Sequence, residues 1–157
     1  MSPSYKSEYP AGLAVDSSII SFFENFYRIS DTPGNHEAYA DNFTDDATFI
    51  LASKVSRGRS QIISTRKGMW ANIGARRHAP TKIFPFGNNS RAFMLHGDVA
   101  FAFRDGRQGT LPWAARAELV QSPAGGWKMR FYQVYLDTLP LRNTGNGVDG
   151  TKSSEST

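Results

Sequence analysis

The amino-acid sequence predicts an α+β domain in which N-terminal helices cover one face of a curved antiparallel sheet. In the first part of the chain, and again over residues 60–73, apolar residues recur at helical spacing. From His78 onward the apolar residues alternate with polar ones, which is typical of strands, and turn residues separate the alternating segments. A chain of 157 residues can bury a single core, so we expect one domain.

The first two helices are indicated by capping residues and by ring spacing. Asp16 can accept hydrogen bonds from the first turn of a helix that ends near Ser30, before the turn residues 31–34. A second helix is expected from His36 to Phe43, with Asn35 as its cap.

A third helix is expected from its cap at Ser60 to Ile73, followed by Gly74 in a left-handed conformation. The expected strands cover residues 47–52, 78–86, 92–96, 99–104, 111–121 and 127–138, with turns at Gly97-Asp98, Asp105-Gly106 and 123–126. Both ends are poor in apolar residues, so we expect a flexible tail over 1–15, a single domain over 16–139 and a disordered tail over 140–157.

Composition excludes several classes of function. The chain has no cysteine, which removes thiolate nucleophiles and cysteine-based metal sites. No apolar run approaches the roughly 20 residues that span a bilayer, and residues 1–12 do not resemble a secretory signal. We therefore expect a soluble intracellular protein that does not insert into membranes. No phosphate-binding glycine loop, nucleophile elbow or redox motif is present, so no cofactor is expected.

The formal net charge of +4 raises the question of a nucleic-acid partner. No Lys/Arg block and no nucleic-acid-binding motif accompanies the basic residues, so we expect no nucleic acid and predict a solvated surface for them. Attraction of an anionic or carbonyl-rich ligand is the weaker alternative. The basic residues in question are Arg57, Arg59, Arg66, Lys67, Arg76 and Arg77.

The junction Phe43-Thr44-Asp45-Asp46-Ala47-Thr48 resembles the helix-to-strand entry of the NTF2-like (cystatin-like, SnoaL-like) cone. Ketosteroid isomerase, scytalone dehydratase and SnoaL-type cyclases share that fold, and the resemblance covers about residues 16–138. It implies a pocket, open at one end, between the helices and the concave face of the sheet. It also implies a homodimer through the convex face of the sheet. The same cone serves as a transport factor and as a plain binding module, so the resemblance is specific for fold rather than for chemistry.

His78 is the first candidate for catalysis. It matches the place where scytalone dehydratase and many SnoaL-like proteins carry a histidine that points into the cone, and an imidazole suits proton transfer near neutral pH. Asp31 resembles the acidic residue that scytalone dehydratase carries beside its histidine, although Asp31-Thr32-Pro33-Gly34 is also ordinary turn chemistry.

Tyr27 and Arg116 complete the catalytic candidates. Tyr27 precedes Asp46 at a spacing that resembles the oxyanion-binding tyrosine of ketosteroid isomerase, but it can equally be a core tyrosine. Arg116 can face the pocket and stabilise an oxyanion, or face outward and pair with Glu118. A register slip of one residue exchanges these faces, so the sequence leaves both open.

The expected substrate-binding residues are mostly aromatic and suit a small hydrophobic or polycyclic substrate: Phe49, Met69, Trp70, Phe101, Trp113, Glu118, Phe131 and Tyr132. Neither His36 nor His96 has metal-ligand spacing to another His, Asp or Glu, so no metal is expected.

The chain departs from its enzyme relatives on the first strand. Leu51 stands where ketosteroid isomerase carries its general base, and Ile50-Leu51-Ala52 replaces a tyrosine of scytalone dehydratase. The leading hypothesis is a cofactor-independent acid–base enzyme, an isomerase, cyclase or dehydratase of a hydrophobic carbonyl intermediate of secondary metabolism. The alternatives are a non-catalytic binding or carrier protein and a dimeric NTF2-like scaffold.

Overall fold

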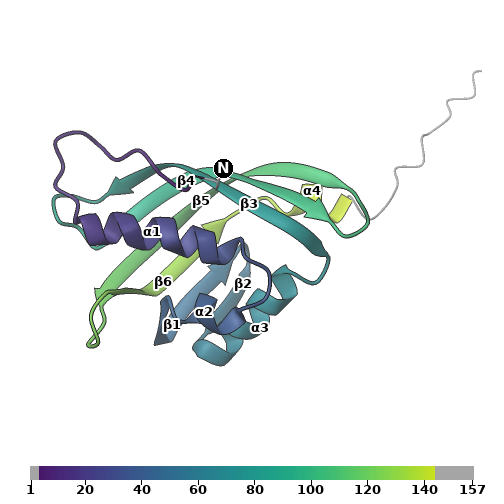
Figure 1. The fold of residues 1–157 in the computed structure, drawn as a ribbon, viewed down its shortest axis with the longest axis horizontal. Helices are drawn as coiled ribbons and strands as arrows, with labels where there is room; N and C mark the ends of the chain where they lie inside the picture. Colours follow the sequence, from purple (N-terminus) through teal and green to yellow (C-terminus); the bar gives the residue numbers. More distant parts are fainter. Residues whose placement is uncertain (1–3, 144–157) are drawn as a thin grey trace, which may run out of the picture.

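The computed structural model describes residues 4–143 and confirms the α+β arrangement (Figure 1). The elements in chain order are α1 (Ser17–Ser30), α2 (His36–Ala40), β1 (Phe43–Leu51), β2 (Lys54–Arg57), α3 (Arg59–Met69), β3 (Ile73–Pro85), β4 (Ala92–Phe103), β5 (Gln108–Gln121), β6 (Trp127–Tyr135) and α4 (Leu139–Asn143). The six strands form one sheet in the order β2-β1-β6-β5-β4-β3. Among the pairs of neighbouring strands in residues 4–143, only β1–β6 is parallel.

Helix α1 lies across one face of the sheet and closes the core (Figure 1). Asp16 caps its first turn by accepting from the backbone N–H of Ser18 at 2.8 Å, as the sequence predicted. Its buried stripe of Ile19, Phe23, Phe26 and Tyr27 packs into the same cluster as the inward residues of the strands. The apolar periodicity of α1 therefore determines which of its side chains reach the interior.

Strand β4 runs straight through Gly97 and Asp98, so the turn expected there is wrong. Gly97 pairs with Pro80 of β3, next to a shift in the β3–β4 register. A Cβ atom at Gly97 would overlap the carbonyl oxygen of Ala79. The glycine thus permits a close approach of two strands, which is the other common reason for glycine inside a strand.

Helix α3 is shorter than expected, and its N-cap lies two residues earlier. Gly58, with a φ of +78°, occupies the N-cap position instead of Ser60, and the helix ends at Met69. Ile73 and Gly74 already belong to β3 rather than to the end of a helix. The preceding hairpin of β1 and β2 turns at Ala52, whose φ is +53°. The sequence shows no glycine or asparagine there, so β2 was not predicted.

The N-terminal segment, expected as a tail over 1–15, packs against the domain within the described residues. Tyr5 is buried, and Glu8 pairs with β3 through hydrogen bonds from its N–H to Thr81 O (2.9 Å) and from Ile83 N–H to its carbonyl (3.0 Å). At the other end, residues 139–143 form α4, so helical structure continues past the expected boundary between the domain and the C-terminal tail. The rest of the predicted C-terminal tail, residues 144–157, lies outside the described residues.

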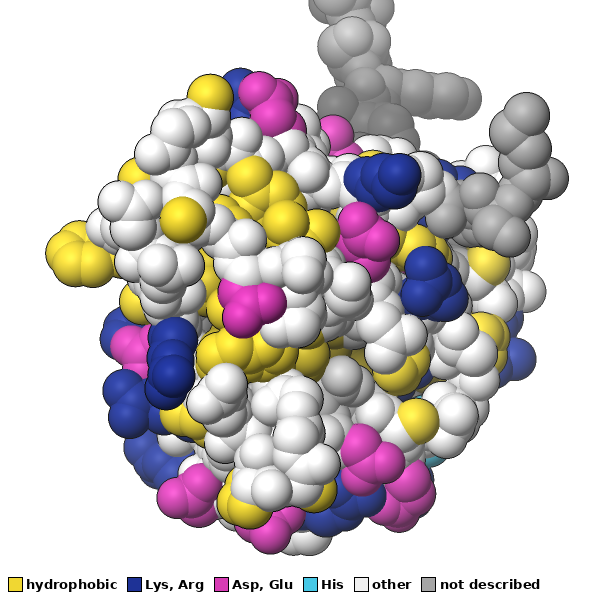
Figure 2. All heavy atoms as spheres, turned by 60° about the vertical axis from the view of Figure 1, so that its left-hand side comes forward, with side chains coloured by type: hydrophobic (Ala, Val, Ile, Leu, Met, Phe, Trp, Pro, Cys, Tyr) yellow, Lys and Arg dark blue, Asp and Glu magenta, His cyan; other side chains and the backbone are white. Residues whose placement is uncertain are grey.

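Charged side chains of both signs are interspersed on the face of the molecule shown in Figure 2. Lys and Arg do not gather there into one continuous patch, and hydrophobic side chains show between the polar ones. None of the helices in residues 4–143 is long and apolar enough to cross a membrane.

Candidate functional site

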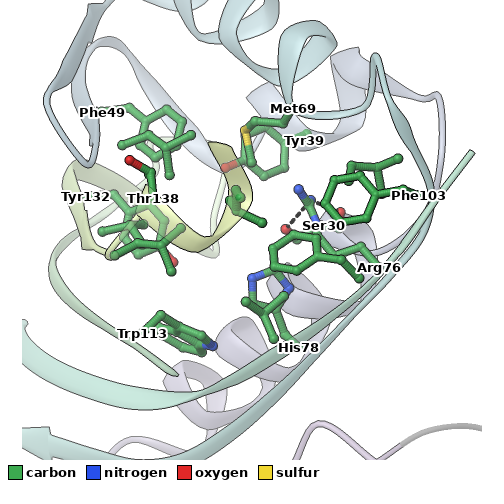
Figure 3. A pocket seen from close by; sticks show the side chains of 17 residues that line it. Ser30, Tyr39, Phe49, Met69, Arg76, His78, Phe103, Trp113, Tyr132 and Thr138 are labelled. Atoms are coloured by element: carbon green, nitrogen blue, oxygen red, sulfur yellow. Dashed lines mark hydrogen bonds between the residues drawn. The ribbon is translucent and has the colours of Figure 1, made fainter. Parts of the chain in front are cut away.

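A cavity of about 170 Å³ lies between the inner face of the sheet and the elements packed over it (Figure 3). Polar groups occupy one side, where Ser30, Arg76 and His78 lie, while the remaining wall is mainly apolar. The lining residues are Ser30, Tyr39, Phe49, Leu51, Met69, Ile73, Arg76, His78, Val99, Phe101, Phe103, Trp113, Tyr132, Val134, Leu136, Thr138 and Leu141. An apolar cavity with a few convergent polar groups is the usual form of a small-molecule site.

His78 and Asp31 form a tight pair at the edge of this cavity. The Nδ1 atom of His78 lies 2.6 Å from Oδ1 of Asp31, and the backbone N–H of His78 donates to Oδ2 at 2.7 Å. Asp31 caps the C-terminal end of α1, and its carboxyl group is almost fully buried. Because an ionised carboxylate only accepts hydrogen bonds, it holds the proton of a neutral His78 on Nδ1 and leaves the Nε2 lone pair free.

Burial lowers the pKa of His78 below its ordinary value near 6.5. The hydrogen bond and the negative charge of Asp31 raise this pKa, whereas the positive charges of Arg76 and Arg66 lower it further. The net direction is downward, so the imidazole is neutral at neutral pH. A neutral imidazole whose orientation is fixed by a carboxylate is suited to act as a general base.

Tyr27 reaches the cavity through another tyrosine rather than directly. Its hydroxyl lies 2.9 Å from the hydroxyl of Tyr132, which does line the cavity, and its ring centroid lies 5.2 Å from that of His78. Burial raises the pKa of both phenols well above the usual 10, so both stay protonated and can donate.

Arg66 and Arg76 are buried, so the predicted solvated surface is wrong for these two residues. Arg66 donates to the carbonyl oxygens of Ser30, Ile29 (3.1 Å) and Thr32 (2.6 Å), and Arg76 donates to the same Ser30 carbonyl. These carbonyls lie at or just beyond the C-terminal end of α1, where a helix favours positive charge. The sequence does carry a signal that Arg76 faces inward. Arg76 lies two residues before His78, and residues two apart in a strand share a face of the sheet.

Trp70 is buried but does not belong to the cavity wall, contrary to prediction. Its ring lies against both arginines, at 5.2 Å from Cζ of Arg66 and 4.8 Å from Cζ of Arg76. Trp70 therefore supports the guanidinium groups from behind through cation–π contacts.

Arg116, Glu118 and Phe131 lie on the outer face of the sheet, so their predicted places in the site are wrong. Arg116 donates to Glu118 at 2.7 Å and stacks over the ring of Phe131 at 4.5 Å, and Arg130 also pairs with Glu118 at 3.0 Å. The alternative that the sequence left open, outward pairing of Arg116 with Glu118, is the one observed.

The other predicted wall residues, Phe49, Met69, Phe101, Trp113 and Tyr132, do line the cavity. Sequence reasoning missed the contribution of the C-terminal segment, where Leu136, Thr138 and Leu141 complete the wall. Leu51, at the position of the missing steroid-isomerase base, also faces the cavity. Within the described residues no group of three or more His, Asp or Glu side chains could hold a metal ion.

The sequence matches no protein-family model and no curated protein. Its backbone, however, is similar to many solved structures. A proposed aromatic ring hydroxylase of Novosphingobium aromaticivorans is 22% identical with a TM-score of 0.66, covering 76% of this chain and 87% of that one. A proposed scytalone dehydratase of the same organism is 16% identical with a TM-score of 0.66, over 77% and 83% of the two chains.

Nuclear transport factor 2 of Cryptosporidium parvum is 18% identical with a TM-score of 0.62, and the match covers 74% of this chain and 90% of that one. At these identities the similarity establishes the architecture and not the activity. The helices over a six-stranded, mostly antiparallel sheet, together with these neighbours, show that the chain has the NTF2-like, or cystatin-like, fold.

Proposed function

We propose that this chain is a cofactor-independent acid–base enzyme that acts on a small hydrophobic carbonyl compound. The observation that carries the proposal is the His78–Asp31 pair, in which a 2.6 Å contact fixes Nδ1 while His78 borders the cavity. A base at the edge of an apolar cavity can remove a proton from a carbonyl compound that is bound there and shielded from water.

In the proposed step, Nε2 of His78 takes a proton from the carbon next to the carbonyl group, and the C–H electrons form an enolate. With Tyr27 donating to Tyr132, the hydroxyl proton of Tyr132 is available to stabilise the enolate oxygen. Returning the proton to another carbon gives an isomer. Delivering it to a β-hydroxyl group instead releases water, which is the dehydration in the name of one structural neighbour.

The size of the cavity narrows the substrate class. A cavity of about 150 Å³ in another protein holds benzene, so the 170 Å³ here suits a compound of one or two rings rather than a larger polycycle. Space for a guest also argues against a scaffold whose interior is filled by its own side chains.

The test is hydrogen–deuterium exchange of an enolisable bicyclic ketone, 2-tetralone, in D₂O, followed by proton NMR. The wild-type protein should accelerate exchange, and His78→Gln should reduce the acceleration by about 100-fold or more. His96→Gln is the matched control, because His96 is exposed and stacks on Phe84 outside the cavity. Equal exchange by His78→Gln and wild type would show that His78 is not the base.

A binding or carrier protein is the second candidate. It is favoured by Leu51, which leaves the cavity without a carboxylate at the position of the isomerase base. This candidate predicts saturable binding of 2-tetralone with no exchange above the rate in buffer. A calorimetric titration with 2-tetralone, combined with the exchange measurement, therefore separates the two functions.

A further inference from the structure

The polar side of the cavity holds more positive than negative charge. Two buried guanidinium groups, those of Arg66 and Arg76, lie near one buried carboxylate, that of Asp31. The charge of Asp31 raises the pKa of both arginines, against the lowering caused by burial. His78 is neutral and adds no charge, so these three buried charged groups together carry a net positive charge. A buried excess of positive charge favours an anionic ligand.

The two arginines differ in how much of their hydrogen-bonding capacity the protein uses. Both terminal nitrogens of Arg66 donate to backbone carbonyls. In Arg76 only Nη2 does so, with a further bond of 3.1 Å to Oγ of Ser30. The Nε atoms of both arginines are buried without a hydrogen bond, and that of Arg76 lies 3.6 Å from Oδ1 of Asp31. The two residues differ at Nη1, which makes no hydrogen bond to residues 4–143 in Arg76. Arg76 therefore has unused donors, whereas Arg66 is largely satisfied by the end of α1.

Arg76 also borders the cavity, which Arg66 does not. The close view shows its guanidinium group between Ser30 and the cavity, with Tyr39 and Met69 nearby (Figure 3). Trp70, with its ring 4.8 Å from Cζ, supports the guanidinium plane. A planar guanidinium held in this way matches the geometry of a carboxylate.

Tyr39 adds a second donor on the same side. It lines the cavity, and no protein group within the described part of the chain accepts a hydrogen bond from its hydroxyl. Burial raises the pKa of Tyr39 to about 12, so its hydroxyl keeps its proton at neutral pH.

We propose that Arg76, assisted by Tyr39, binds the carboxylate of a small aromatic or unsaturated acid, whose apolar part lies among Phe49, Phe101 and Trp113. The inference deepens the proposed function, on which it rests for the reaction at His78. The substrate class becomes an anionic carbonyl compound, such as a keto acid, rather than a neutral ketone. Arg76 is then a binding residue that selects the charge of the ligand.

Calorimetric titration of the full chain with benzoate and with benzamide tests this inference. The two probes have similar shape and differ in charge. Wild-type protein should bind benzoate about tenfold or more tightly than benzamide, as expected for charge-assisted hydrogen bonds. Arg76→Gln should bind both equally within about twofold, and Arg76→Lys should keep part of the preference. Arg77→Gln is the matched control, because Arg77 is the exposed neighbour of Arg76, and it should behave as wild type.

The wild-type comparison stands even if Arg76→Gln does not fold, because it needs no variant. Benzamide binding as tightly as benzoate to the wild type would overturn the inference. So would a preference for benzoate that persists in a folded Arg76→Gln protein or disappears in Arg77→Gln.

Failure of this inference is distinguishable from failure of the proposed function, because benzoate has no proton that a base could exchange. His78-dependent exchange of 2-tetralone without a preference for benzoate would refute the anion site and keep the acid–base enzyme. A preference for benzoate without His78-dependent exchange of either 2-tetralone or an enolisable keto acid such as phenylpyruvate would support the anion site and refute the enzyme.

Discussion

Asp31 is the residue on which the site depends most, because four groups converge on its buried carboxyl. It accepts from the ring and the backbone N–H of His78, lies 3.6 Å from Nε of Arg76, and interacts with the hydroxyl of Tyr5. Burial and the charge of Asp31 raise the pKa of Tyr5 to about 12, so Tyr5 stays a donor. The carboxylate thereby joins the N-terminal segment, α1 and β3 at the edge of the cavity.

The lowered pKa of His78 predicts a pH profile. His78 accepts protons only in its neutral form, which persists below the ordinary pKa of 6.5. The His78-dependent exchange rate should therefore be constant from about pH 8 to 6.5 and fall only at lower pH. Measured exchange across this range checks it, and a midpoint above 6.5 would contradict it.

Asp31→Asn should move the same midpoint to still lower pH, because Asp31 raises the pKa of His78. The plateau rate should also fall, since the amide holds the Nδ1 proton less firmly. His96→Gln should leave the profile unchanged. A purely structural role for Asp31 would lower the rate without moving the midpoint.

The unusual pKa also affects stability. In the unfolded chain the imidazole takes up a proton near pH 6.5, whereas in the folded protein it does so only at lower pH. Below 6.5 the unfolded state binds more protons, so the contribution of His78 to stability decreases as the pH falls toward the folded pKa.

At the residue scale, the sequence predicted what depends on local position and missed what depends on distant partners. His78 and Asp31 lie at fixed places relative to α1 and β3, so a family resemblance located them. The burial of Arg66 depends on carbonyls more than thirty residues away, at 29, 30 and 32. Such partners leave no trace in a pattern of charged residues. The face of Arg116 followed from strand register, which hydrophobic alternation left undecided.

At the scale of elements, the close approach of β3 and β4 at Gly97 predicts that two glycine-to-alanine substitutions differ in their effect on stability. Gly97→Ala should reduce the free energy of unfolding by about 2 kcal/mol, because the added methyl meets the backbone of β3 at Ala79 and Pro80. Gly109→Ala, in β5, meets nothing within 4 Å and is the control. Urea denaturation of both variants measures the difference, and equal stabilities would show that the close approach is not required.

Element type was easier to predict than element boundaries. The apolar stripe of α1 and the alternation of the later strands were sufficient for the fold class. The β2 hairpin was missed because Ala52 adopts a positive φ without the glycine that usually marks it. Helix α4 was missed because the sequence around it is polar, as in a flexible tail, although its residue Leu141 contributes to the cavity wall.

At the scale of the whole molecule, we propose a homodimer that pairs through the outer face of the sheet. Exposed Phe84, Met94 and Tyr135 lie on β3, β4 and β6, and each is more than two-fifths exposed. The ion pairs of Arg116 and Arg130 with Glu118 lie on the same face. A second copy would cover both the apolar side chains and the charged network, because a two-fold interface brings the same patch to itself.

Light scattering after size exclusion should give about twice the 17.4 kDa of one chain. Met94→Glu should shift the protein toward the monomer, because it replaces an exposed apolar side chain of the proposed interface with a charge that dimerisation would desolvate. Ser21→Glu adds the same charge on the exposed side of α1 and should leave the dimer intact. A wild-type monomer at micromolar concentration would refute the proposal.

The pairing of Glu8 with β3 affects the tendency of the protein to aggregate. A sheet that ends in a long unpaired strand offers its free N–H and C=O groups as a template for other chains, and so invites aggregation. Here β3 is the terminal strand on one side, and the N-terminal segment occupies part of its free edge. On the other side the terminal strand is β2, which spans only Lys54–Arg57. The segment around Glu8 therefore protects the sheet from edge-to-edge assembly, and removing it would expose the longer of the two sheet edges.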